Sequence, residues 1–125
     1  MSDTKKNILI IDDDDRNIFA LTATLKAKGF SCVSCVDAHK GLEIMRSSTP
    51  IHAVLMDMMM PDMDGYDAIP KIRGIDHRKD VPVFAVTAQA MTGDREKCLE
   101  AGANDYISKP IDVDRLLFLL STSIV

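Results

Sequence analysis

One apolar stretch that ends in an acid constrains this chain more than any other feature. Val54-Leu55-Met56 is an unbroken apolar run, and Asp57 ends it. Such a run suits a short strand covered on both faces, as strands of parallel sheets are. Turn-forming residues follow within a few positions: Pro61, Asp62, Asp64 and Gly65. The stretch therefore predicts that Asp57 lies at the carboxyl end of a buried strand, where open α/β sheets bind ligands.

Similar apolar runs recur along the chain, and they alternate with segments whose apolar residues have helical spacing. They predict five strands, at residues 7–11, 30–36, about 51–57, 81–87 and 105–108. The predicted helices begin at Asp14 or Asp15, at Ala38, near Asp64, at Thr92 and after the cap Asp112. Alternating strands and helices with short connections predict an α/β fold with one parallel sheet and helices on both faces.

Three details of the helices are also predicted. Pro70 lies well past the first turn of its helix, where proline costs ~3 kcal/mol, so we expect a kink or an early end there. The segment Thr92–Ala101 has little large apolar content beyond Leu99, which makes it a candidate moving part. In the last helix Phe118 should point away from the core. The predicted core face of that helix comprises Val113, Leu116, Leu117, Leu120 and Ile124.

Size and charge exclude several classes of protein. The 125 residues and 13.8 kDa fit one domain over residues 1–125, with residues 1–6 as a loose tail. A net charge of -4 and a pI near 5.2 argue against nucleic-acid binding. No apolar run approaches the ~20 residues of a membrane span, and no signal peptide precedes the first strand. We therefore expect a cytoplasmic protein without nucleic-acid or membrane partners, and its cysteines are expected to be reduced.

The predicted strand ends carry a set of side chains with a common chemistry. Asp12, Asp13 and Asp57 crowd negative charge that must be offset, and a hard divalent cation such as Mg²⁺ is the natural partner of several carboxylates. Lys109 adds a mobile positive charge for a phosphoryl group, and Thr87 adds a hydroxyl donor. The set suits the transfer of a phosphoryl group onto a carboxylate.

Taken together, four segments resemble one protein family. Ile8 to Asp13, the Asp57 strand with its turn, Val86-Thr87-Ala88 and Asp105 to Pro110 are similar to the response-regulator receiver domain, in the same order and spacing. The resemblance covers essentially the whole chain. Residues 89–102 further resemble receivers found in hybrid kinases and phosphorelays.

The resemblance implies a flavodoxin-like (βα)5 three-layer sandwich with strand order 2-1-3-4-5. It implies that Asp57 accepts a phosphoryl group from a phosphohistidine on a histidine kinase or histidine phosphotransfer protein. Asp13 would bind Mg²⁺ directly and Asp12 largely through water. Asp57 and the backbone carbonyl of Met59 would complete the protein ligands.

The same resemblance implies a switch. Lys109 would pair with the phosphoryl group, across a cis bond to Pro110. Thr87 would swing toward the phosphate and Tyr106 would follow inward. The movement would alter the face made by the last two helices and the strand between them, which is also a candidate homodimer surface.

Structural roles and other functions remain open alternatives. The aspartates are also suited to capping helices, and Lys109 to being a solvated surface lysine. A phosphatase or hydrolase that forms an aspartyl phosphate is the alternative function, but such enzymes usually carry a second aspartate where this chain has Met59. No glycine-rich loop follows the first strand, which disfavours dinucleotide binding. We therefore expect a signalling receiver that catalyses only its own phosphorylation and slow dephosphorylation.

Overall fold

Five parallel strands form one sheet in the order β2-β1-β3-β4-β5. The computed structural model describes residues 5–88 and 93–124. The strands are β1 (Asn7–Ile11), β2 (Ser31–Cys35), β3 (Ala53–Asp57), β4 (Val83–Thr87) and β5 (Asp105–Ser108). The helices are α1 (Asp15–Ala27), α2 (Ala38–Arg46), α3 (Gly65–Arg73), α4 (Asp94–Ala101) and α5 (Val113–Ser123), with a short 3-10 helix η1 (Asp76–Arg78) before β4. The expected flavodoxin-like fold and strand order are confirmed.

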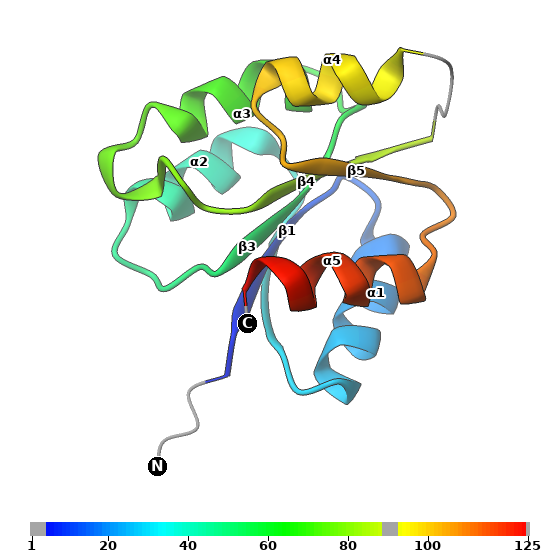
Figure 1. The fold of residues 1–125 in the computed structure, drawn as a ribbon. Coiled ribbons are helices and arrows are strands. Elements are labelled where there is room, and N and C mark those ends of the chain that lie inside the picture. Colours follow the sequence, from blue (N-terminus) through cyan, green and yellow to red (C-terminus); the bar gives the residue numbers. More distant parts are fainter. Residues whose placement is uncertain (1–4, 89–92, 125) are drawn as a thin grey trace.

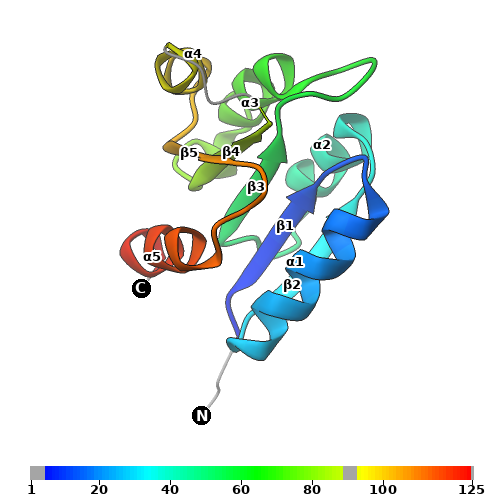
Figure 2. The ribbon, with the colours of Figure 1, turned by 90° about the vertical axis from the view of Figure 1, so that its right-hand side faces the viewer.

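The helices cover the sheet in two layers. Helices α1 and α5 lie on one face, and α2, α3 and α4 lie on the other (Figure 1 and Figure 2). Alternate residues of each central strand therefore enter different cores, so that Leu55 packs with the α1 and α5 side chains while Val54 and Met56 pack with those of α2 and α3. No helix in the described ranges is long and apolar enough to cross a membrane.

Aspartate side chains begin four of the helices in the described part of the chain. Asp14, Asp37, Asp64 and Asp112 each have extended backbone angles and accept a hydrogen bond from an N–H of the first turn. The predicted starts near Asp64 and after Asp112 are confirmed, and Asp14 rather than Asp15 caps α1. The predicted start at Thr92 lies outside the described residues, as do the first four residues of the expected tail.

Of the two outcomes predicted at Pro70, the early end is wrong and the kink stays a prediction. Helix α3 continues through Pro70 to Arg73, and Pro70 lies on its exposed side. Ile69 and Ile72 are fully buried on the opposite side. Burying each of these side chains stabilises the helix by ~1.5–3 kcal/mol, which offsets the proline cost.

The predicted core face of the last helix is partly wrong. Val113 is 37% exposed, whereas Leu119 is buried with Leu116 and Leu120. Several apolar stripes run along this leucine-rich helix, and helical spacing alone does not choose among them. Contact with the sheet selects the stripe that contains Leu119. Phe118 is 62% exposed and points away from the core as predicted.

Gly65 brings the start of α3 against the end of β3. A Cβ atom added to Gly65 would overlap Sδ of Met58 and would lie 3.0 Å from the Met58 Cα and 3.1 Å from Cγ of Met56. Because Met58 directly follows Asp57, the missing side chain at Gly65 sets how closely the loop after β3 packs.

We expect Gly65→Ala to lower the free energy of unfolding by on the order of 1–3 kcal/mol, because the added methyl overpacks a buried contact. Chemical denaturation monitored by circular dichroism measures the change. Gly74→Ala at the other end of α3 is the matched control, since its Cβ would meet nothing closer than the Lys71 carbonyl at 3.5 Å. Equal destabilisation by the two substitutions would contradict the close-approach argument.

Candidate functional site

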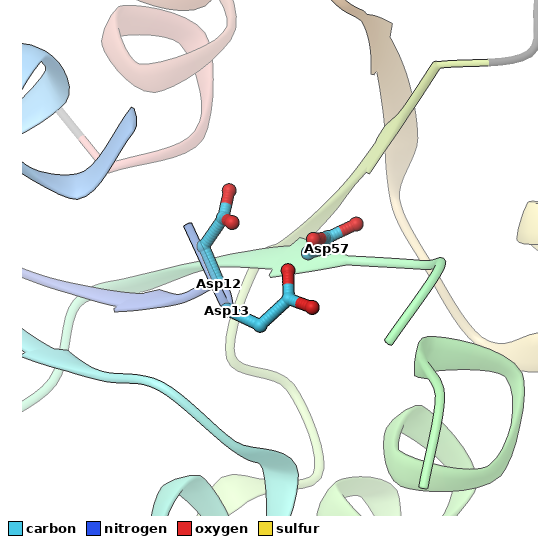
Figure 3. A group of neighbouring side chains, drawn as sticks. All are labelled: Asp12, Asp13 and Asp57. Carbon is cyan, nitrogen blue, oxygen red and sulfur yellow. The ribbon is translucent and has the colours of Figure 1, made fainter. Parts of the chain in front are cut away.

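Strand register brings Asp12 and Asp57 side by side. Ile11 on β1 pairs with Met56 on β3, so the next residue of each strand is one of the two aspartates. Both carboxylates are almost completely buried, with 2% of Asp12 and 3% of Asp57 exposed. Asp13 is exposed, yet one oxygen from each of the three carboxylates lies within 4.8 Å of the others. Figure 3 shows the three side chains gathered at the ends of β1 and β3.

Hydrogen bonds hold the two buried carboxylates in place. Oδ1 of Asp12 accepts the Asp14 N–H at 2.9 Å, and its Oδ2 accepts the Asn17 side-chain amide at 2.5 Å. Oδ1 of Asp57 accepts the Met59 N–H at 3.0 Å. Each buried carboxylate therefore has a fixed orientation, which leaves Oδ2 of Asp57 for a charged partner.

Lys109 supplies that positive charge. Its Nζ lies 3.4 Å from Oδ2 of Asp57 and 3.6 Å from Oδ2 of Asp12. The backbone N–H of Lys109 donates a hydrogen bond to the backbone carbonyl of Thr87 at 2.8 Å, which anchors the chain after β5 to the end of β4. The bond between Lys109 and Pro110 is cis, as the resemblance implied. The predicted meeting of an amine with the acidic strand ends is thus present.

Burial makes the Asp57 carboxyl unusually basic. Loss of water around the carboxylate, with a smaller contribution from the charge of Asp12, raises the pKa of Asp57 from 3.8 to about 6. The Met59 N–H and the Lys109 ammonium oppose this rise.

The donor set fits a hard divalent cation. Three clustered carboxylates offer oxygen ligands only, which matches Mg²⁺, and the single ammonium leaves net negative charge at the site. Asp12, Asp13 and Asp57 are therefore all brought together as predicted. Coordination of the ion by the Met59 carbonyl stays a prediction. Met59 itself is 53% exposed.

The two predicted switch residues lie beside this cluster. Thr87 ends β4 and is 3% exposed. Tyr106 lies on β5, paired with Ala85 of β4, and its half-buried ring packs against the core beneath α2, α3 and α4. Their movement stays a prediction.

Two residues that sequence reasoning missed belong to this end of the molecule. The side chain of Asn17 donates a hydrogen bond to Asp12. The sequence feature that could have indicated this role is the position of Asn17 three residues after the cap Asp14. Phe19 on α1 is 77% exposed. In the sequence, Phe19 lies outside the helical spacing that Leu21 and Leu25 share, which could have indicated that its side chain is exposed.

The cluster of possible metal ligands in the described residues includes no histidine or cysteine. His39 on α2 contacts Asp62 at 2.9 Å, and His52 and His77 bond to backbone groups. The three cysteines are free thiols, as expected.

Comparison with known proteins gives one consistent result. Residues 8–121 match the family described as response regulator receiver domain. The histidine-protein kinase BarA of Escherichia coli strain K12 is 39% identical over 113 residues, which are 90% of this chain but only 12% of BarA. The chain therefore spans about an eighth of the length of that relative.

Solved structures agree with this similarity. The receiver domain of sensor histidine kinase PA1611 from Pseudomonas aeruginosa PAO1, which holds magnesium in its active-site cleft, is 34% identical with a TM-score of 0.88, over 97% of this chain and 98% of that one. The Ssk1 receiver domain of Saccharomyces cerevisiae, in complex with the histidine phosphotransfer protein Ypd1, is 25% identical with a TM-score of 0.87, over 96% of this chain and 89% of that one.

Removing the charge of Asp57 should stabilise the cation-free protein. The pKa of Asp57 in the folded chain is about 6, above its ordinary value of 3.8. The ionised carboxylate therefore destabilises the fold, by the full amount at pH values above about 6. This cost disappears as the pH falls toward 4. In chelator at pH 7.5 we expect Asp57→Asn to be more stable than the native chain by on the order of 1–3 kcal/mol, and this gap should close near pH 4.

Denaturant titrations at several pH values measure the gap. Asp80→Asn removes an exposed carboxylate in the loop before β4 and serves as the control, with a change below about 0.5 kcal/mol at each pH. A native chain more stable than Asp57→Asn at pH 7.5 would show that the buried charge is not destabilising.

Proposed function

Because this chain belongs to the response regulator receiver domain family, a family of two-component and phosphorelay signalling, we propose that Asp57 is its phosphoryl acceptor. One observation carries the proposal: the buried Asp57 carboxylate is clustered with two further aspartates, and the Lys109 ammonium lies 3.4 Å from it. The donor is a phosphohistidine on a histidine kinase or a histidine phosphotransfer protein. Residues 1–125 act as one cytoplasmic receiver domain.

Mg²⁺ is the proposed cofactor. Asp13, Asp57 and the Met59 carbonyl would hold the ion directly, and Asp12 largely through water. The clustered carboxylate oxygens support this assignment, as does the magnesium in the cleft of the similar PA1611 receiver. The bound ion supplies positive charge that neutralises the carboxylates and the phosphoryl oxygens.

The residues of this chain position the reacting groups. A carboxylate oxygen of Asp57 forms the new bond to phosphorus as the phosphorus–nitrogen bond of the donor breaks. The electron pair of that bond stays on the imidazole nitrogen, which then takes a proton. The single negative charge of the Asp57 carboxylate is replaced by the two charges of its acyl phosphate, and the Lys109 ammonium then pairs with the phosphoryl oxygens.

Phosphorylation of Asp57 shifts the conformational equilibrium of a second surface. Thr87 turns its hydroxyl toward the phosphoryl oxygens and Tyr106 moves inward, which changes the face made by α4, β5 and α5. Contacts made only with the phosphoryl group present stabilise the changed state. That face is the proposed output surface and a candidate homodimer contact.

The donor protein is proposed to dock beside α1. This helix begins directly after the acidic loop, and Phe19 on it is the most exposed of the large apolar side chains described, at 77%. Exposed aromatic side chains are frequent binding hot spots.

A phosphatase acting through an aspartyl phosphate is the alternative function. Such an enzyme needs an acid or base two residues beyond the nucleophile, and Met59 at that position carries neither. Sustained turnover of phosphomonoesters by the purified chain would favour this alternative.

Intact-mass measurement tests the acceptor. After incubation with acetyl phosphate and Mg²⁺, the native chain should gain one phosphoryl group, and Asp57→Ala should gain none. Labelling of both proteins would place the phosphoryl group elsewhere, and labelling of neither would overturn the proposed function.

Substitution of Phe19 tests the docking surface. We expect Phe19→Ala to slow phosphotransfer from radiolabelled Ypd1 by ~10-fold, since losing ~1.4 kcal/mol of contact energy gives that factor. Labelling by acetyl phosphate, which needs no docking, should stay within about twofold of native. Phe118→Ala on α5 is the matched control, because its side chain is exposed to a similar extent on a different helix. Equal slowing by both substitutions would argue against docking at α1.

A further inference from the structure

Asn17 reaches from the first turn of α1 into the acidic cluster. Its Nδ2 donates to Oδ2 of Asp12 at 2.5 Å, while the Asp14 N–H donates to Oδ1 of the same carboxylate at 2.9 Å. An ionised carboxylate only accepts hydrogen bonds, so the Asn17 amide must present its NH₂ group there. Both oxygens of Asp12 therefore have neutral donors.

The place of Asn17 in its helix explains this reach. Asp14 is the cap and Asp15 the first residue of α1, so Asn17 occupies the third helical position, from which side chains extend back toward the helix start. The Asp12 N–H is bonded to the Cys35 carbonyl at 3.1 Å, which fixes the main chain of Asp12 as well. Two hydrogen bonds therefore orient this buried carboxylate, and a third fixes the main chain that carries it.

We propose, on the basis of the function above, that Asn17 is a positioning residue for cation binding and phosphoryl transfer, because its amide keeps the Lys109 ammonium shared between Asp12 and Asp57. Nζ of Lys109 lies 3.6 Å from the same Oδ2 of Asp12 that Asn17 binds, and 3.4 Å from Oδ2 of Asp57. The side chain of Asn17 bonds to Asp12, and Asn17 therefore acts through Asp12.

Loss of the amide would redistribute these charges. Oδ2 of Asp12, in a side chain only 3% exposed, would lack its neutral donor, and the ammonium of Lys109 is the charged donor already beside it. Lys109 then moves toward Asp12 and away from Asp57. The carboxylate of Asp12, no longer held at both oxygens, ceases to offer the hydrated cation a fixed acceptor.

Four variants test the proposal. Asn17→Leu keeps the approximate shape without a donor, Asn17→Ala removes both shape and donor, and Asn17→Gln keeps the amide. Arg16→Ala is the matched control, because that neighbouring side chain on α1 is 95% exposed. Calorimetric titration with Mg²⁺ alone gives the dissociation constant, and intact mass after acetyl phosphate at saturating Mg²⁺ gives the labelling rate.

We expect both donor-free variants to raise the Mg²⁺ dissociation constant by ~10-fold and to slow labelling at saturating Mg²⁺, the usual size of effect for a group that orients a metal site from outside. Asn17→Gln should recover most of the affinity, and Arg16→Ala should match the native chain. Native affinity in both donor-free variants would overturn the proposal. A loss confined to Asn17→Leu would also overturn it, since crowding would then be the cause.

A cation-free measurement separates this role from the proposed function. In chelator, the NMR signals of the Asn17 side-chain NH₂ should shift in Asp12→Ala, while circular dichroism verifies that each variant is folded; unshifted signals would overturn the contact. A native chain that is not labelled on Asp57 refutes the proposed function itself. A native chain that binds Mg²⁺ and is labelled, alongside donor-free variants that behave identically, refutes only the role of Asn17.

Discussion

Crowding of negative charge at one edge of the sheet is the constraint on which the rest of this structure depends. Asp12 and Asp57 are nearly inaccessible to water, Asp13 lies within reach of both, and the Lys109 ammonium faces the buried pair at 3.4–3.6 Å. Burial raises the pKa of Asp57 to about 6, so its ionised form carries a free-energy cost that folding elsewhere must offset. A cation relieves that cost, which ties function to a locally destabilised part of the fold.

Parallel topology creates this crowding without any long loop. Because all five strands run in the same direction, their carboxyl ends meet at one edge, and the pairing of Ile11 with Met56 leaves Asp12 beside Asp57. Close packing then preserves the arrangement: Gly65 lets α3 start directly against Met58, the residue after the acceptor. The main chain around the site is thus fixed by the sheet, and its side chains are oriented by short hydrogen bonds.

Different elements of the molecule supply different surfaces. Helix α1, which begins directly after the acidic loop, presents the exposed Phe19. At the β5 edge of the sheet, Asp105 at the start of β5 pairs with Arg95 of α4 at 3.5 Å and with Arg115 of α5 at 3.2 Å. Tyr106 follows Asp105 directly, so a movement of its ring acts next to the ion pairs that join α4, β5 and α5. The proposed docking surface for the phosphoryl donor and the proposed output surface therefore lie on different elements.

The sequence alone determined the strands, the aspartate caps and the identity of the acidic site, because apolar runs, turn formers and strand-end acids are local signals. It did not determine which stripe of the last helix is buried, since Val113 and Leu119 fit helical spacing equally well and only contact with the sheet distinguishes them. The sequence also left an early end at Pro70 as one of two predicted outcomes, because the burial of Ile69 and Ile72 that keeps α3 continuous arises from tertiary packing. The position of Asn17 three residues after the cap Asp14 is visible in the sequence, but its bond to Asp12 was not predicted, since that bond requires the start of α1 to pack against the end of β1. Local chemistry thus predicted which residues form the acidic site, and three-dimensional packing decided which residues hold them.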